Sequence, residues 1–104
     1  MSEPKNIHLV PIGGTAMTPL AALLAEEGHR VSGSALVDLY PPMSTLLESL
    51  QIRVERGFAA EHVPARCDCV VVGNAALRDN VEAAEAARRN LPTLNLDRQR
   101  FQER

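Results

Sequence analysis

The segment IHLVPIGGTAMTPLAALLAEEG, residues Ile7 to Gly28, decides the fold of this chain. It opens with an apolar run up to Ile12, which predicts a buried strand that ends at a glycine pair. The apolar residues that follow recur at the i, i+3, i+4, i+7 spacing of one helix face, at Met17, Leu20, Ala21 and Leu24. A strand that enters a helix through glycines is the first unit of an α/β fold.

Both ends of this helix are marked in the sequence. Thr15 can cap its start, or Thr18 can do so with Pro19 at the first helical position, where proline is tolerated. Gly28 is a typical stop signal, because glycine readily adopts the left-handed backbone that ends many helices. We therefore expect the helix to end just before Gly28.

Four more strands and two more helices are expected after Gly28. The strands are Arg30–Gly33, Ile52–Glu55, Cys69–Val72 and Thr93–Leu96. After a loop at Leu36–Pro42, one helix runs over Met43–Leu50, with Pro42 suited to its first position. The other helix follows the cap residue Asn80 and runs to about Arg89, with Asn90 in the left-handed position beyond it.

The strand patterns differ in a way that predicts their places in the sheet. Ile52 and Val54 alternate with charged residues, which is typical of an edge strand with one wet face. Cys69–Val72 is continuously apolar, as in a strand covered by helices on both faces, and we place it at the centre of the sheet.

This order of elements predicts an α/β fold with a parallel five-stranded sheet, strand order 3-2-1-4-5 and helices on both faces. Ligands in such sheets bind at the carboxyl ends of the strands, where the strand order reverses. The reversal lies between the first and fourth strands. The predicted site therefore combines Pro11–Met17, Gly33–Ala35 and Gly73–Asn80.

Length and composition limit the function further. The 104 residues make a single domain, and the 45% of hydrophobic residues are enough for one core. A formal net charge of -2, without a basic run, argues against nucleic acid as a partner. No apolar stretch approaches the ~20 residues that a membrane span needs, so we expect a cytoplasmic protein with no membrane partner.

The sequence lacks the residues for a disulfide framework, a metal site or an ATP-binding phosphate loop. The cysteines, Cys67 and Cys69, lie at the start of a buried strand and are interpreted as core or near-core thiols rather than a disulfide. The three histidines have no metal-like spacing, so no metal site is expected. Lys5 is the only lysine, and no GxxxxGK[ST] phosphate loop occurs in the chain.

The glycine turn itself is a degenerate dinucleotide motif. PIGGTA, Pro11 to Ala16, has proline in place of the first glycine. Its glycines still let the backbone approach a phosphate at the start of the helix, although a tight turn that binds nothing has the same sequence. A dinucleotide also wants an acidic residue after the second strand, where this chain has Ser34 and Ala35, and this disfavours an NAD-responsive domain.

Other polar residues near the predicted site have two interpretations each. Tyr40 can stack on a base or fill a gap between helices, and we favour the latter. Arg78, near Asn74, can bind a phosphate or be solvated, and Asn80 is interpreted first as a helix cap. His8 is interpreted as a packed rather than reactive residue, since no Ser, Cys or Asp partner is placed for it by the sequence.

The chain resembles the N-terminal domain of the Mur ligases, the ATP-dependent amide ligases of peptidoglycan assembly. The resemblance covers Ile7–Ser34, Leu39–Phe58 (LYPPMSTLLESLQIRVERGF) and Val70–Asn80 (VVVGNAALRDN). The YPPMSTLLE and GNAxxR stretches are most similar to the murein tripeptide ligase branch, which recycles peptidoglycan. The muramate–alanine ligases share the glycine turn.

This resemblance implies a Rossmann-like domain that binds UDP-N-acetylmuramate and contributes recognition, with no catalytic residue and no cofactor of its own. ATP and Mg²⁺ are implied for the full-length enzyme, whose ATP-binding and C-terminal domains would lie beyond this chain, so the chain alone is not expected to catalyse ligation. The implied ligand-binding residues are Gly13, Gly14, Thr15, Met17, Ser34, Asn74, Arg78 and Asn80.

Three residues depart from the family pattern. Pro11 replaces a glycine and removes a backbone donor, Ala35 replaces the aspartate of a GSD motif, and Asp79 adds a negative charge beside the expected phosphate. These departures support a rival interpretation, a structural or docking module that keeps the fold without a ligand. A second alternative is the N-terminal domain of a UDP-N-acetylmuramate–L-alanine ligase.

Overall fold

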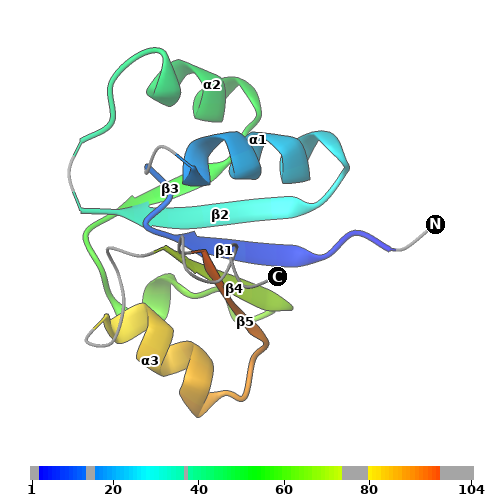
Figure 1. Cartoon of the computed structure of the whole chain (residues 1–104), viewed down its shortest axis with the longest axis vertical. Coiled ribbons are helices and arrows are strands. Elements are labelled where there is room, and N and C mark those ends of the chain that lie inside the picture. The colour runs from blue at the N-terminus through cyan, green and yellow to red at the C-terminus, as the bar shows by residue number, and fades with distance from the viewer. Residues whose placement is uncertain (1–2, 14–15, 37, 74–79, 97–104) are drawn as a thin grey trace.

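In a computed structural model, the described residues 3–13, 16–36, 38–73 and 80–96 form a five-stranded parallel sheet with helices on both faces (Figure 1). The strands are β1 (Asn6–Val10), β2 (Arg30–Ala35), β3 (Arg53–Arg56), β4 (Cys69–Gly73) and β5 (Thr93–Leu96). The helices are α1 (Met17–Glu26), α2 (Met43–Ser49) and α3 (Val81–Arg88), with a 3-10 turn η1 (Ala60–His62). The strand order is β3-β2-β1-β4-β5, which confirms the predicted class and topology.

The middle strand is β1, not β4. It pairs with β2 on one side, with Leu9 opposite Gly33, and with β4 on the other, with Val10 opposite Val72. The prediction that Cys69–Val72 forms the centre was wrong, because a continuous apolar run reports cover on both faces rather than the central position. The expectation for β3 is confirmed, since it pairs with β2 alone at the edge of the sheet.

The start of α1 differs from the expectation. Its N-cap is Ala16, without a side-chain cap hydrogen bond, and Thr18 lies inside the helix. The Thr18 hydroxyl donates to the carbonyl oxygen of Ile12 at 2.9 Å, so it ties the helix to the glycine turn instead of accepting from helix amides. Thr15 lies outside the described residues. The stop at Gly28 is confirmed, since its φ is 98° and the helix ends at Glu26.

The other two helices begin and end close to the predicted residues. Pro42 is the N-cap of α2 rather than its first residue. The side chain of Asn80 accepts hydrogen bonds from the amides of Glu82 and Ala83, which confirms the predicted cap of α3. Asn90 has a φ of 59°, as expected for the residue that ends this helix.

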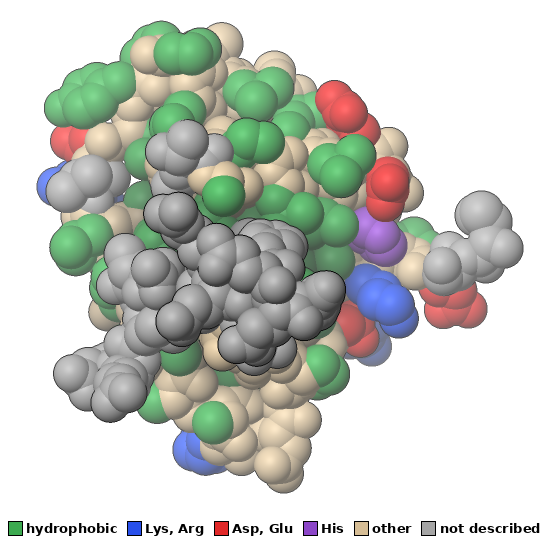
Figure 2. Space-filling model, viewed as in Figure 1, with side chains coloured by type: hydrophobic (Ala, Val, Ile, Leu, Met, Phe, Trp, Pro, Cys, Tyr) green, Lys and Arg blue, Asp and Glu red, His purple; other side chains and the backbone are tan. Residues whose placement is uncertain are grey.

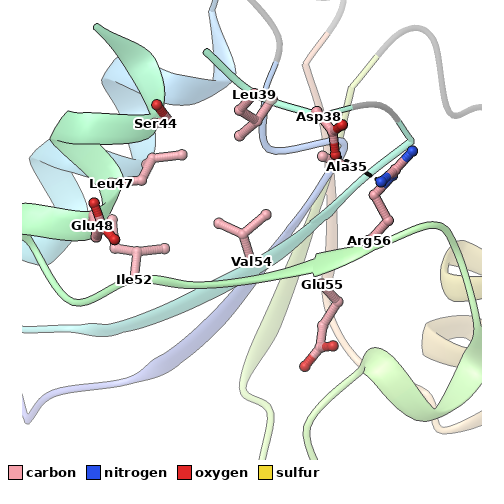
Figure 3. Close-up of a pocket in the computed structure, with 10 residues that line it drawn as sticks. All are labelled: Ala35, Asp38, Leu39, Ser44, Leu47, Glu48, Ile52, Val54, Glu55 and Arg56. Atoms are coloured by element: carbon pink, nitrogen blue, oxygen red, sulfur yellow. Dashed lines mark ion pairs between the residues drawn. The ribbon is translucent and has the colours of Figure 1, made fainter. Parts of the chain in front are cut away.

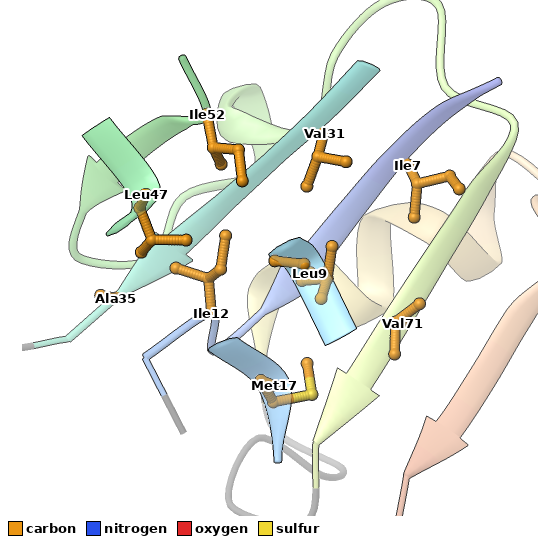
Figure 4. Packing of buried hydrophobic residues seen from close by; sticks show 10 residues of the cluster. Ile7, Leu9, Ile12, Met17, Val31, Ala35, Leu47, Ile52 and Val71 are labelled. Carbon is orange, nitrogen blue, oxygen red and sulfur yellow. The ribbon is translucent and has the colours of Figure 1, made fainter. Parts of the chain in front are cut away.

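The core has two halves, one on each face of the sheet. The larger half lies under α1 and α2, where Leu9, Ile12 and Leu47 are almost completely buried (Figure 4). The smaller half lies under α3 and contains Val70 and Ala86, also fully buried. Odd and even positions of the strands thus face different halves, as the two-residue period of a strand requires.

The two cysteines are free and half-buried, and they pack against the two halves of the core, which confirms the prediction of near-core thiols. Burial raises the pKa of both the Cys67 and the Cys69 thiol. Both thiols are therefore mainly protonated at neutral pH, and a protonated thiol is a poor nucleophile.

Part of the surface carries many hydrophobic side chains. In the space-filling view, hydrophobic side chains gather over α1 and α2, while charged groups lie scattered near the margin (Figure 2). Leu23, in α1, is half exposed. Among the described residues, no helix is both long and apolar enough to cross a membrane.

Candidate functional site

The candidate site is the edge of the sheet at which the parallel strands β1, β2 and β4 end. Four of the predicted ligand-binding residues are described there: Gly13 after β1, Met17 at the start of α1, Ser34 in β2 and Asn80 before α3. The remaining four, Gly14, Thr15, Asn74 and Arg78, lie outside the described residues, as does Asp79. The ligand contacts of all eight stay predictions.

Ile12 and Gly13, at the start of the glycine turn, contact the end of β2 and the loop that follows it. The amide of Ile12 donates to the carbonyl oxygen of Ser34 at 2.9 Å, which joins the turn to the end of β2. Gly13 also has a packing role, because a Cβ at this position would lie 2.5 Å from Cδ2 of Leu39. The missing side chain therefore lets the loop after β2 pack against the turn.

The Met17 side chain belongs to the core. It is 4% exposed and is part of the cluster under α1 and α2 (Figure 4). Its sulfur would lie 3.5 Å from a Cβ at Gly73, so the side chain packs across the ends of β1 and β4. Because its side chain is buried, Met17 can contact a ligand only through its backbone, at the first position of α1.

A buried carboxylate lies directly behind this edge. Glu82, in the first turn of α3, has no exposed side-chain surface. Its Oε1 lies 2.6 Å from His8 Nε2 and accepts a hydrogen bond from the Ser34 hydroxyl at 2.8 Å. Its Oε2 accepts from the Ala59 amide and from His62 Nδ1, both at 3.0 Å. One side chain thus joins β1, β2, η1 and α3.

The histidines complete this cluster. His8 is fully buried, and its Nδ1 lies 2.8 Å from the Ser32 hydroxyl. The prediction of a packed His8 is confirmed, but the sequence had placed no serine or acidic partner for it, and both are present. His62 is 17% exposed and is the member of the cluster that reaches solvent. Among the described residues, no three His, Cys, Asp or Glu side chains lie where they could hold a metal ion.

The cluster makes the stability of the fold sensitive to acid. Desolvation raises the pKa of Glu82, but hydrogen bonds from His8, Ser34 and the Ala59 amide lower it by a larger amount. The pKa of Glu82 therefore lies below its ordinary value of 4.5. A carboxyl group with a lowered pKa stabilises the fold above its unfolded pKa, and this contribution is lost as pH falls through the folded pKa. We therefore expect the free energy of unfolding to decrease as pH falls below about 4.5.

Urea unfolding of the parent chain and of Glu82→Gln checks this expectation. The difference between their free energies of unfolding should narrow between about pH 7 and about pH 3, because the protonated carboxyl group resembles the amide. The other carboxylates contribute equally to the pH dependence of both proteins, so their contributions cancel in the difference. One of them is Glu85, whose pKa is lowered to about 2 by hydrogen bonds from Arg88 and Arg89. A difference that stays constant with pH would contradict the role given to Glu82.

A groove of about 480 Å³ opens beside the end of β2, under α2 (Figure 3). An ion pair of 2.7 Å between Arg56 and Asp38 lies at its rim. Glu55 points to the opposite face of the sheet in this view. The apolar residues that line the groove are Ala35, Leu39, Leu47, Ile52 and Val54. This volume is in the range of small-molecule pockets, roughly 300–1,000 Å³.

Sequence reasoning missed Glu82 and the groove. The sequence does contain a sign of Glu82. His8, Ser32 and Ser34 are polar residues within largely apolar strands, and they belong to one face of the sheet. Buried polar groups need partners, so a partner on the helix over that face could have been sought. Tyr40 was interpreted as filling a gap between helices, and this was wrong, since it is 72% exposed.

Fold and site together define a Rossmann-like α/β domain whose candidate ligand edge lies where the strand order reverses. Comparison with known proteins then gives the family. The family model described as "Mur ligase family, catalytic domain" matches residues 6–99. The chain belongs to the Mur ligase family, as the sequence resemblance predicted.

Two relatives represent the two branches named above. A UDP-N-acetylmuramate–L-alanine ligase of Anaeromyxobacter sp. (strain Fw109-5) is 43% identical over 89% of this chain. A UDP-N-acetylmuramate–L-alanyl-gamma-D-glutamyl-meso-2,6-diaminoheptandioate ligase of Escherichia coli (strain K12) is 39% identical over 86% of the chain. The chain spans only 20% of the length of each relative.

A solved structure is similar as well. The UDP-N-acetylmuramate:L-alanyl-gamma-D-glutamyl-meso-diaminopimelate ligase from Neisseria meningitides superimposes with a TM-score of 0.79 at 40% identity. The match covers 89% of this chain and 29% of that one.

Proposed function

We propose that this chain is the N-terminal, UDP-N-acetylmuramate-binding domain of a larger amide ligase of peptidoglycan recycling, and that it contributes recognition rather than chemistry. The observation that carries the proposal is the position of the glycine turn. It follows β1, which has β2 on one side and β4 on the other, so the turn lies at the reversal of strand order. Open α/β sheets bind their ligands at this point.

The names of the relatives support the chemical class of the ligand, since both act on UDP-N-acetylmuramate. In the proposed complex the diphosphate lies against Gly13 and the start of α1, where backbone amides and the helix dipole favour an anion. The groove beside Ala35 gives the nucleoside part a surface with both apolar and polar side chains next to the same edge.

ATP and Mg²⁺ do not fit the residues of this chain. The sequence has no phosphate loop of the form GxxxxGK[ST], and the described ranges hold no cluster of metal-ligating side chains. We therefore assign ATP binding and ligation to other domains of the ligase.

A thermal-shift titration tests the proposed ligand. UDP-N-acetylmuramate should raise the melting temperature of the chain saturably, because a ligand that binds only the folded state stabilises it, by about 2.7 kcal/mol at one hundred times its dissociation constant. UDP should give a smaller rise, and NADH none. No shift with any UDP compound at millimolar concentration would contradict the proposal and favour a module that keeps the fold without a ligand.

A variant of the glycine turn locates the site. A side chain at Gly13 would strike Leu39 as well as block a diphosphate, so the double variant Gly13→Val, Leu39→Ala should be compared with Leu39→Ala alone. We expect the ligand-induced shift to disappear in the double variant and to remain in the single one. An equal shift in both would place the ligand elsewhere.

The two branches of the family predict different full-length enzymes. The relative with 43% identity favours the muramate–alanine branch, whereas the solved structure with a TM-score of 0.79 favours the tripeptide branch. We propose the tripeptide branch because the YPPMSTLLE loop carries that resemblance. A full-length ligase that joined free L-alanine, and no tripeptide, to UDP-N-acetylmuramate would reverse this choice.

A further inference from the structure

Glu82 bonds to both of the polar site residues that the structure describes. Its carboxylate accepts from the Ser34 hydroxyl at 2.8 Å, and its own amide donates to Oδ1 of Asn80 at 2.8 Å. These two residues are distant in the sequence, one at the end of β2 and the other at the start of α3. Glu82 therefore fixes the distance between two sides of the candidate site.

The third side, the glycine turn, is reached through Ser34. The carbonyl oxygen of Ser34 accepts from the amide of Ile12 at 2.9 Å, and Ile12 precedes Gly13 directly. A movement of Ser34 would therefore move the start of the turn. The Thr18 hydroxyl bonds to the carbonyl oxygen of the same Ile12, so α1 follows the turn as well.

Glu82 is itself held from outside the site. His8 Nε2, the Ala59 amide and His62 Nδ1 all contact its carboxylate at 2.6–3.0 Å. With the four donors Ser34, His8, Ala59 and His62 around two oxygens, the carboxylate has a defined orientation. It also has no solvent-exposed surface through which water could replace a lost partner.

These hydrogen bonds also determine which groups of Ser34 and Asn80 remain as donors or acceptors. The Ser34 hydroxyl has a single hydrogen, which it gives to Glu82. The side-chain oxygen of Asn80 accepts from two amides of α3, so its NH₂ group remains as the donor. Glu82→Gln replaces one of the two accepting oxygens by an NH₂ group, so the hydrogen bonds of the cluster, that of Ser34 among them, have to rearrange.

We propose that Glu82 is the positioning residue of the candidate site: without touching the ligand, it holds β2, α3 and the glycine turn in the arrangement that binds the UDP-sugar. The proposal rests on the proposed function. It differs from a purely structural role in its consequence, because a structural role lowers the stability of the domain but leaves the affinity of the folded molecules unchanged.

Calorimetric titration of the 104-residue chain with UDP-N-acetylmuramate separates these roles. Glu82→Gln keeps the shape of the side chain, and the matched control Glu85→Gln makes the same change on the same helix, where the carboxylate contacts Arg88 and Arg89 instead. At a temperature where circular dichroism finds all three proteins folded, we expect Glu82→Gln to bind roughly tenfold more weakly, and Glu85→Gln to bind like the parent.

A spectroscopic readout accompanies the affinity. The ¹⁵N resonances of the Ile12 and Gly13 amides should differ between the parent and Glu82→Gln. Neither residue contacts Glu82 through a hydrogen bond in the structure, so a difference reports a change passed on through Ser34. If Glu82→Gln does not fold, His62→Gln replaces it, since His62 lies at the exposed end of the cluster and its loss frees one carboxylate oxygen in part. Several-fold weaker binding is expected for that variant.

The outcomes are distinct. A folded Glu82→Gln, or His62→Gln in its place, that binds like the parent and leaves the glycine-turn amides unshifted would overturn the positioning role while the proposed function stands. A parent chain that binds neither UDP-N-acetylmuramate nor UDP would overturn the proposed function, and the positioning role would fall with it. Equal weakening by Glu85→Gln would also overturn the positioning role, because the effect would then come from the charge of α3.

Discussion

Replacing Glu82 with alanine is expected to lower the free energy of unfolding by about 3–5 kcal/mol, because each buried donor left without an acceptor costs about 1–3 kcal/mol. The variant leaves His8 without its acceptor in a region closed to water, and it also removes the acceptor of the partly exposed His62. Natural domains are stable by only about 5–15 kcal/mol, so this is a large fraction of the total. Urea unfolding followed by circular dichroism measures it.

The control for this prediction is Glu85→Ala. Glu85 forms ion pairs of 2.7 Å with Arg88, whose side chain is 71% exposed, and with Arg89, which is 24% exposed, and pairs that water can reach contribute less than fully buried ones. We expect a clearly smaller change than for Glu82→Ala. Similar losses in both variants would mean that the buried cluster has no special part in the stability of the fold.

Gly33→Ala is expected to destabilise the domain by about 1–3 kcal/mol or more, as overpacking of a close-packed core does. A Cβ at this position would lie 2.6 Å from Cβ of Ile12 and 2.7 Å from the carbonyl oxygen of Leu9. Neither atom is the end of a flexible side chain, so β1 and β2 would have to separate. The same unfolding experiment measures the loss.

Gly73→Ala is the matched control for that substitution. Gly73 lies at the end of β4, and its nearest neighbour would be Cδ of Pro11 at 3.2 Å, followed by the sulfur of Met17 at 3.5 Å. A shift of a few tenths of an ångström relieves these contacts. A loss as large as that of Gly33→Ala would show that glycine is needed on β4 for a reason other than space.

Much of the fold could be predicted because the periodicity of apolar residues reports local structure. The helix after the glycine pair, the edge strand β3 and the cap at Asn80 were all predicted, since each depends on residues a few positions apart. The cap of α1 was not, because Thr18 has the sequence pattern of a cap while its hydroxyl bonds to Ile12. Local sequence does not decide between two acceptors.

The candidate site could be predicted in outline for a different reason. The carboxyl edge follows from topology alone, and Gly13, Met17, Ser34 and Asn80 all lie in the segments that it brings together. Glu82 was missed because a glutamate in the first turn of a helix is favourable in water too. Its contact with His8, 74 positions away, is a pairing across the core that no periodicity reports.

The cluster around Glu82 also limits how the protein can evolve. Loss of one polar member leaves the others buried without partners, whereas replacing a whole buried ion pair by well-packed apolar residues is often neutral or stabilising. We therefore expect substitutions at His8, Ser34 and Glu82 to be tolerated together rather than one at a time. A variant with only one of these residues made apolar is expected to be less stable than either the polar or the fully apolar form.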